Sequence, residues 1–139
     1  MEIRCFSEAD TDVVIELWRA SGLLHPINDP YRDINRKTSD SPWGFLVLTE
    51  NDEIIGSVMV GYDGHRGWIN YLACHPDHLR KGVGTALMTR ARELLLDRGC
   101  PKINLQVRSG NDAAIDFYES IGYTDDSVTS LGLRLLPDN

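Results

Sequence analysis

Residues 68–87 constrain the fold most, because they pass from a strand pattern through a glycine-bearing turn into a helix pattern. The first part is apolar, and Pro76 interrupts it. A polar, basic turn over residues 77–84 follows. From Thr85 onward, apolar side chains recur at helical spacing at Leu87, Ala91, Leu94 and Leu95. The stretch therefore predicts a strand whose end lies beside the start of a helix.

A turn of this kind indicates a site for an anion. The first N–H groups of a helix lack partners within the helix, and the helix dipole adds partial positive charge there. Gly82 and Gly84 would let a ligand approach the backbone, since no Cβ stands in the way. We interpret the turn as a candidate pyrophosphate site, although glycines also precede helices that bind no ligand.

Three phosphate-binding patterns can be compared with this turn. A P-loop requires a lysine directly after its last glycine, and none follows Gly84. A Rossmann fingerprint requires a third glycine or alanine where Leu87 stands. The third pattern, R/Q-x-x-G-x-G/A, belongs to the GNAT acyltransferases, and residues 79–84 resemble it except at the first position, Leu79.

Periodicity and turn residues predict a mixed α/β fold of the α+β kind. We expect a mostly antiparallel sheet of about six to seven strands with helices on both faces, in the order β-α-α-β-β-β-α-β-α-β-β. Strands are expected at residues 2–6, 43–49, 54–62, 68–74 and 103–107, and as a final pair after Tyr123 whose second member spans residues 128–135. Helices are expected from Ser7 to Gly22, over 31–38, from Thr85 to Arg98 and over 111–121.

The bulk properties place limits on function. A chain of 139 residues is expected to form one domain, residues 1–139, with a core that needs no metal or disulfide. Three separated cysteines, Cys5, Cys74 and Cys100, with no signal peptide or membrane-length apolar run, favour reduced thiols in a cytoplasm. The net charge of −7 argues against nucleic acid as a partner and would attract a cationic acceptor.

Two segments together resemble the GNAT superfamily of N-acetyltransferases over the whole chain. Residues 72–87 match its phosphate turn, and residues 104–123 match N-x-x-A-x-x-x-Y-E-x-x-G-F/Y, with Asn111, Tyr118 and Gly122 in step. Shorter matches at residues 28–30, 61–68 and 130–132 are similar to the bacterial YpeA-like group. The resemblance implies a GNAT fold and acetyl-CoA as co-substrate, with no metal, and a homodimer by analogy.

The resemblance also implies roles for individual residues. The strand ending at Cys74 would part from the strand at 103–107, and the pantetheine arm of acetyl-CoA would enter the wedge. Tyr118 would serve as the catalytic acid toward the leaving thiolate. Acetyl-CoA would be held by Leu72, Ala73, Cys74, Arg80, Lys81, Gly82, Val83, Gly84, Thr85 and Asn111. The acceptor would lie against residues 25–31 and 61–66, with Asn28, Tyr31, Asp63 and His65 as candidate contacts.

Two positions depart from the family pattern. Leu79 replaces the Arg or Gln at the head of the phosphate turn, so one side-chain contact is missing. Gln106 stands where the similar ribosomal-protein N-terminal acetyltransferases carry a glutamate base, and an amide cannot accept the proton. These departures leave open an alternative, a non-catalytic acyl-CoA-binding or regulatory module that retains the fold.

Other interpretations of the same residues remain possible. Tyr118 could be a core tyrosine on an apolar helix face. Asp63 and His65 could supply the base, or could be solvated turn residues. The run Cys74-His75-Pro76-Asp77-His78 lacks the second ligand pair that a structural zinc site requires, and Cys74 has no identifiable base that would make it a nucleophile. We therefore expect acetyl transfer from acetyl-CoA to an amine, with Tyr118 as the acid.

Overall fold

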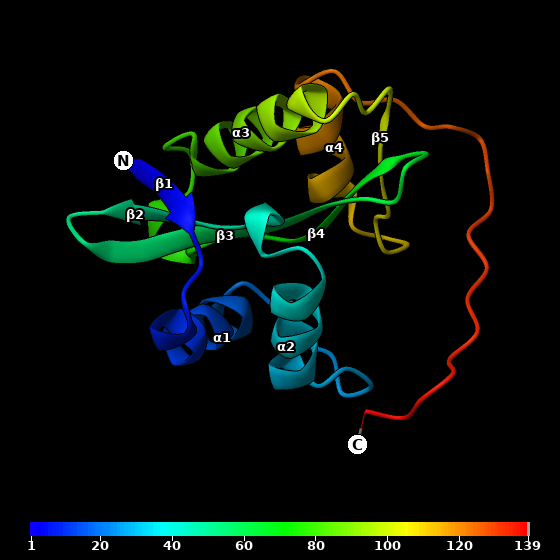
Figure 1. Ribbon diagram of the computed structural model, residues 1–139. Helices are drawn as coiled ribbons and strands as arrows, with labels where there is room; N and C mark the ends of the chain where they lie inside the picture. The colour runs from blue at the N-terminus through cyan, green and yellow to red at the C-terminus, as the bar shows by residue number, and fades with distance from the viewer. Residues whose placement is uncertain (139) are drawn as a thin grey trace.

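The computed structural model describes residues 1–138 and places a five-stranded sheet between two layers of helices (Figure 1). The strands lie in chain order across the sheet, and only the last pair, β4–β5, is parallel. The strands are β1 (Glu2–Cys5), β2 (Phe45–Glu50), β3 (Glu53–Tyr62), β4 (Gly67–Cys74) and β5 (Ile103–Leu105). The helices are α1 (Thr11–Ala20) and α2 (Pro30–Asp40) on one face, and α3 (Val83–Asp97) and α4 (Asp112–Ser120) on the other.

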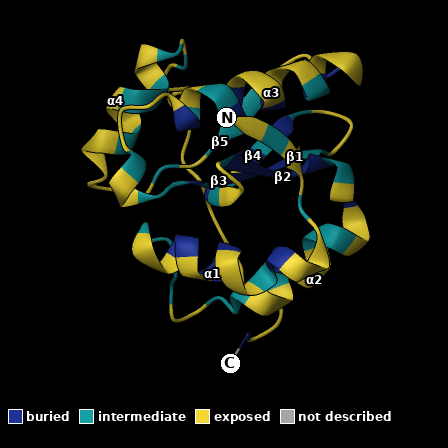
Figure 2. Ribbon diagram, turned by 90° about the vertical axis from the view of Figure 1, so that its left-hand side faces the viewer, coloured by how far each residue is buried: buried dark blue, intermediate teal, exposed yellow. Residues whose placement is uncertain are grey.

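Each face of the sheet carries its own apolar core, which explains why β2 and β3 are buried along most of their length (Figure 2). The core under α3 contains Leu48, Val58, Leu87 and Leu95, among other residues. The core under α1 and α2 is built around Trp18, which is fully buried. Within residues 1–138, no helix combines the length and apolar character needed to cross a membrane.

The helix boundaries follow local signals. Asp29 caps α2, because its Oδ1 accepts hydrogen bonds from the N–H groups of Tyr31 and Arg32, and Pro30 occupies the first helical position. Gly22 and Gly99 adopt positive φ angles of 74° and 75° shortly after α1 and α3 end. The four predicted helices are thus present, with ends shifted by one to four residues.

The sequence-based strand count is corrected by the structure. Residues 1–138 contain five strands rather than six or seven, because the expected final pair after Tyr123, including residues 128–135, does not form. The tail instead runs extended along the outside of the molecule and is held by side-chain contacts (Figure 1). The fifth strand also ends at Leu105, two residues earlier than expected.

Close packing of α3 against the sheet depends on Gly56 of β3. A Cβ atom at Gly56 would lie 2.5 Å from Cγ1 of Val83 and 3.0 Å from Cδ1 of Leu87. The first turn of α3 therefore rests directly on the β3 backbone. This contact fixes the position of the helix N-terminus relative to the sheet.

We expect Gly56→Ala to destabilise the fold by about 1–3 kcal/mol, because α3 must move to admit the methyl group. Gly61→Ala, in the same strand, is the matched control, since its nearest non-neighbouring atom, Lys37 Nζ, would lie 3.7 Å away. Urea denaturation of the three proteins measures the difference. Equal losses in both variants would contradict the proposed packing contact.

Candidate functional site

Strands β4 and β5 pair over only three residues and then part. Gly67, Trp68 and Ile69 face Ile103, Asn104 and Leu105, where β5 ends. Strand β4 continues through Asn70–Cys74, and these five residues have no β5 partner among residues 1–138. Because backbone groups of a strand alternate between its two sides, part of this segment's N–H and C=O groups faces the opening. We call residues 70–74 the open β4 segment.

A β-bulge lies within the open β4 segment. Met59 pairs with Asn70 while Ser57 pairs with Ala73, so β4 contains one more residue than β3 at this point. Tyr71 takes a φ of 52°, which is uncommon for a residue with a side chain. The bulge changes the direction of the strand where it leaves β5.

Buried hydrogen bonds hold the bulge in place. The Trp18 indole N–H donates to Ser57 Oγ over 2.9 Å, and this hydroxyl donates to the Tyr71 carbonyl over 3.1 Å. The Tyr71 ring stacks on Trp18 at 3.9 Å between centroids. The Tyr71 hydroxyl donates to Asp33 over 2.6 Å, and burial together with this carboxylate raises the pKa of Tyr71. Tyr71 therefore remains protonated and serves as a structural donor.

The turn before α3 presents backbone donors. Arg80 and Gly82 adopt φ angles of 64° and 81°, and Gly82 occupies the N-cap position without a side-chain cap. Within residues 1–138, the N–H groups of Gly82, Val83, Gly84 and Thr85 have no hydrogen-bond acceptor. The first turn of α3 carries no acidic side chain. These features suit an anion.

The side chains of this turn differ in their contacts. Lys81 Nζ lies 3.4 Å from Glu50 Oε1 and 3.1 Å from His78 Nδ1, so part of its charge is already matched. Leu79 is 60% exposed and contributes no polar group. A Cβ at Gly84 would lie 3.1 Å from Cζ of Phe117, so the glycine lets α3 pack closely against α4.

Tyr118 lies on α4 among aromatic rings, with centroids 5.2 Å from Phe117 and 5.7 Å from Tyr123. Burial raises the pKa of Tyr118 to about 12, with a smaller contribution from Tyr123. Its hydroxyl has no hydrogen-bond partner in residues 1–138. A protonated phenol without an internal partner is free to donate to a ligand.

Asn111 and Gln106 each make a contact within the chain. Asn111 is the N-cap of α4, since its Oδ1 accepts from the Ala114 N–H over 3.2 Å. Its NH₂ group is not needed for this cap. Gln106 follows the last residue of β5, and its Nε2 donates to Ser130 Oγ in the tail. The side chain that replaces the expected base thus tethers the tail beside the opening.

Asp63 and His65 lie in the β3–β4 turn, which precedes β4, whereas the open segment is at the other end of that strand. Asp63 accepts hydrogen bonds from the His65 and Arg66 N–H groups and from the Trp68 indole, over 2.7 to 3.2 Å. These bonds lower the pKa of Asp63 to about 2. The hydrogen bonds of Asp63 hold the turn together. A carboxylate with so low a pKa does not accept a proton at neutral pH.

Asn28 and Tyr31 lie at the start of α2, on the other face of the sheet from α3 and α4. Asn28 Oδ1 accepts from Arg134 of the tail over 2.7 Å. Tyr31 is exposed, and its hydroxyl lies 3.5 Å from Asp12 Oδ1. The structure thus places Asn28 beside the tail, and no hydrogen bond within residues 1–138 joins Asn28 or Tyr31 to Asp63 or His65.

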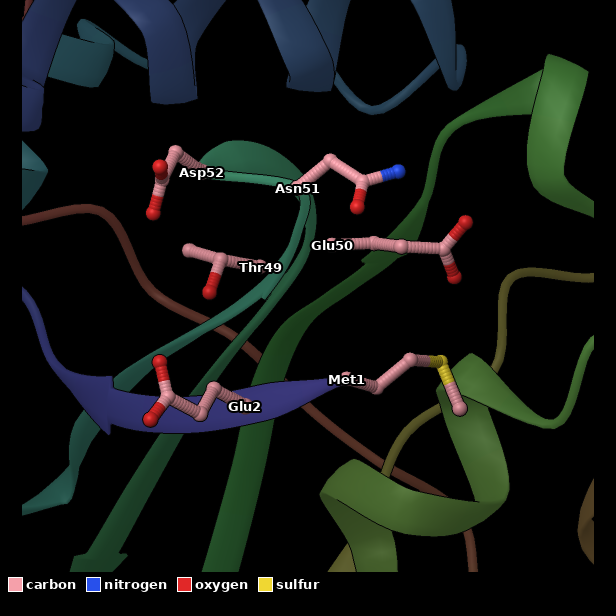
Figure 3. Close-up of a pocket in the computed structure, with 6 residues that line it drawn as sticks. All are labelled: Met1, Glu2, Thr49, Glu50, Asn51 and Asp52. Carbon is pink, nitrogen blue, oxygen red and sulfur yellow. The ribbon is translucent and has the colours of Figure 1, made fainter.

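A separate pocket lies between β1 and the β2–β3 hairpin (Figure 3). Its lining is acidic and polar, with carboxylates from Glu2, Glu50 and Asp52. It lies across the sheet from the β4–β5 opening, and its charge does not suit a phosphate ligand.

In residues 1–138 no group of three or more His, Cys, Asp or Glu side chains could hold a metal ion. Burial raises the pKa of the Cys74 thiol, which disfavours a nucleophilic thiolate.

Residues 11–123 match the Acetyltransferase (GNAT) family. The chain belongs to this family. It is 50% identical over 138 residues to an acetyltransferase of Pectobacterium atrosepticum, covering 99% of this chain and 98% of the relative. It is also 50% identical over 139 residues to one of Sodalis glossinidius, with the same coverage. Among solved structures, Ard1 from Thermoplasma volcanium superposes with a TM-score of 0.80 at 28% identity, covering 88% of this chain and 82% of that chain.

The GNAT assignment made from the two motifs is therefore confirmed, as is the GNAT fold. The ribosomal-protein-S18-alanine N-acetyltransferase from Escherichia coli shares that fold, with a TM-score of 0.73 at 23% identity. Sequence reasoning did not find the Trp18–Ser57–Tyr71 hydrogen bonds or the Tyr71–Asp33 bond in this GNAT protein. No local pattern marks them, because the partners are 14 to 39 residues apart.

We expect Asp63 to contribute stability that depends on pH in the acidic range. Because its folded pKa lies below its unfolded value of about 3.9, the contribution is present above that value and is lost as pH falls toward 2. The gap in denaturation midpoint between the wild type and Asp63→Asn should therefore be constant above about pH 5 and narrow below pH 4. Asp116→Asn, at an exposed position of α4, is the control. A gap that widens on acidification would refute this role.

Proposed function

We propose that this GNAT protein is an N-acetyltransferase that moves the acetyl group of acetyl-CoA directly to an amine. The observation that supports this most strongly is the parting of β4 from β5 after Ile69, beside an uncapped helix N-terminus. The first feature suits an extended amide-bearing chain, and the second suits a diphosphate. Acetyl-CoA carries both groups in one molecule.

The pantetheine arm would lie along the open β4 segment and pair with the backbone of Leu72, Ala73 and Cys74, much as an added strand does. The Cys74 carbonyl already accepts from Ser21 Oγ over 3.1 Å, so the remaining groups would carry most of the pairing. The NH₂ group of Asn111 would serve as an additional donor to the arm. This role is compatible with its capping bond, which uses only Oδ1.

The pyrophosphate would bind to N–H groups from Arg80 to Thr85. Donors that have no acceptor in the chain gain one when the anion binds, so affinity does not require a side chain at every position. Arg80 makes no ion pair within residues 1–138 and would add charge, with Lys81 sharing its own with Glu50. Gly82 allows the left-handed backbone that directs these amides.

In the reaction, the neutral amine attacks the thioester carbonyl, the C–N bond forms, and the C–S bond breaks. Backbone N–H groups of the open β4 segment would stabilise the negative charge on the carbonyl oxygen. Tyr118 would donate its hydrogen to the departing thiolate, for which a protonated phenol is required. The nitrogen loses one proton and the thiolate gains one, so the step balances.

Deprotonation of the amine limits the choice of acceptor. Gln106 cannot accept a proton, Tyr71 donates to Asp33, and Asp63 is too acidic. An alkyl ammonium with a pKa near ~10.4 is about 0.1% neutral at pH 7.4, whereas an α-amino group with a pKa near ~7.8 is about a third neutral. We infer that the acceptor presents an amine of low pKa, and that Asn28 and Tyr31 would contact it. Three free cysteines support a reducing cytoplasm as the setting.

Tyr118→Phe should lower turnover about 10²-fold or more, because the leaving thiolate loses its donor, while the Kd for acetyl-CoA stays within about twofold. Release of free CoA thiol against a panel of peptides and amines measures turnover, and calorimetry measures binding. Tyr123→Phe removes a half-buried hydroxyl next to the same ring and should leave both values unchanged.

Two outcomes would count against this assignment. Equal turnover in Tyr118→Phe and the wild type would exclude the donor role. Binding of acetyl-CoA without thiol release for any amine would favour the non-catalytic acyl-CoA-binding module. Absence of acetyl-CoA binding would remove the proposed function altogether.

Leu79→Arg should tighten acetyl-CoA binding about tenfold, since a charge-assisted hydrogen bond to the diphosphate contributes about 1.5 kcal/mol. The leucine is 60% exposed, so its replacement should not alter stability. Leu96→Arg adds the same charge at a leucine of α3 that is 62% exposed, away from the helix start. An equal gain in both variants would indicate a general charge effect rather than a contact in the turn.

A further inference from the structure

Lys37, in the last turn of α2, differs from the other two lysines of the chain in its surroundings. Lys81 Nζ lies 3.4 Å from Glu50 Oε1, and Lys102 Nζ lies 2.9 Å from both carboxylate oxygens of Asp126. A carboxylate at such a distance stabilises an ammonium ion. In the part of the chain that the structure describes, Lys37 has no carboxylate oxygen within 4 Å of its Nζ.

The groups that contact the Lys37 amine are uncharged. Its Nζ donates to Ser41 Oγ over 2.7 Å and to the backbone carbonyl of Val60 in β3. It also lies 5.6 Å from the centroid of the Trp43 ring. Because Lys37 is half-buried, these groups replace part of the water that would solvate a charged amine.

Two charged groups lie beyond these contacts. Ser41 Oγ donates to Asp40 Oδ2 over 2.8 Å, and the Arg98 guanidinium lies 3.6 Å from the centroid of the Trp43 ring. Burial lowers the pKa of Lys37 to about 8, and the negative charge of Asp40 opposes this shift only in part. At pH 7.4 about a fifth of the molecules of an amine with this pKa are neutral, compared with about 0.1% for an ordinary lysine.

The backbone of Gly61 leaves the amine uncovered on one side. A Cβ atom at Gly61 would lie 3.7 Å from Lys37 Nζ. Apart from Gly61 and its chain neighbours, no other atom of residues 1–138 lies within 4 Å of that Cβ position. Gly61 is itself only half-buried. A small molecule can therefore approach the nitrogen over this glycine.

We propose that Lys37 is an acylation site that reacts directly with small thioesters. The neutral Nζ attacks the thioester carbonyl carbon, the C–N bond forms, and the C–S bond breaks. The nitrogen releases one proton to water and the departing thiolate takes up one, so the step balances. This inference goes beyond the proposed function and does not rest on it, because the reaction requires neither the turn before α3 nor Tyr118.

Acylation would change the contact between α2 and β3. The amide that forms carries no charge and has one N–H, whereas the ammonium of Lys37 has three. Either Ser41 Oγ or the Val60 carbonyl would therefore lose its donor. Acylation would thus loosen the end of α2 from the sheet.

The rate of acetylation at each lysine tests the proposal. The native protein is incubated with S-acetyl-N-acetylcysteamine, a thioester without a nucleotide, and its peptides are followed by mass spectrometry. At pH 7.4 we expect Lys37 to react about tenfold faster than Lys81 or Lys102, because its larger neutral fraction outweighs the weaker nucleophilicity of a less basic amine. Above about pH 9 the rate at Lys37 should level off.

Unfolding supplies the control for this experiment. In concentrated urea the three lysines should react at similar rates, because the surroundings of Lys37 are lost. Equal rates at the three lysines of the native protein would overturn the proposal. A rate at Lys37 that keeps rising tenfold with each pH unit above about pH 9 would overturn it as well.

Two substitutions of Gly61 test the cause of the reactivity. In Gly61→Asp a carboxylate would lie beside Lys37 Nζ and stabilise its ammonium form, so acetylation of Lys37 should slow about tenfold. Gly61→Asn is the matched control, since it adds a side chain of the same size without the charge, and it should keep the rate within about threefold of the wild type. Circular dichroism checks that both variants are folded. Equal rates at Lys37 in the two variants would overturn the proposal.

Discussion

The short pairing between β4 and β5 is the constraint on which the site depends. If β5 followed β4 to Cys74, the backbone groups of the open segment would be used within the sheet and no ligand could pair there. The bulge at Tyr71 turns β4 away, and Ser57 holds it by connecting the Trp18 indole to the Tyr71 carbonyl. Leaving such buried groups unpaired would cost about 1–3 kcal/mol, so these hydrogen bonds stabilise the divergence of β4 from β5.

Helix α3 is positioned from two sides by glycines. Gly56 lets its first turn rest on β3, and Gly84 lets it approach Phe117 of α4. The unpaired amides at the helix start are therefore fixed relative to Tyr118, which follows Phe117 in α4. The sequence suggested that Gly84 serves ligand approach. Its surroundings show a packing role, whereas Gly82 provides the positive φ angle of the turn.

Much of the fold could be predicted because its signals are local. Periodicity located the helices and the first five strands, and two motifs with correct spacing identified the family. The final strands were wrongly predicted, although leucines do alternate with other residues at 131–135 as they would in a strand. A strand also needs a neighbouring strand to pair with, and the sequence does not show whether the chain supplies one. The role of Tyr71 could not be predicted either. No local sequence pattern indicates its φ of 52° or its hydrogen bond to the distant Asp33. Asn111 matches the family motif and also stands where a helix N-cap is expected, and the structure shows that it caps α4.

The environment of Tyr118 limits how it can act as an acid. With a pKa of about 12, it is weaker than a thiol of pKa near ~8.5 by about 3.5 units, so complete transfer to a free thiolate would be uphill by ~5 kcal/mol. Burial would also raise the pKa of a thiol in the same surroundings, because it disfavours both anions. In the proposed reaction Tyr118 would therefore stabilise the thiolate by a hydrogen bond as the C–S bond breaks, and it would release its proton only while receiving another. The one proton that the reaction makes available is on the attacking nitrogen, which becomes strongly acidic once it is bonded to the carbonyl carbon. In the proposed reaction the acceptor amine would consequently have to lie close enough to Tyr118 for the two transfers to be linked, so both the pKa of the amine and its position would decide which amines react.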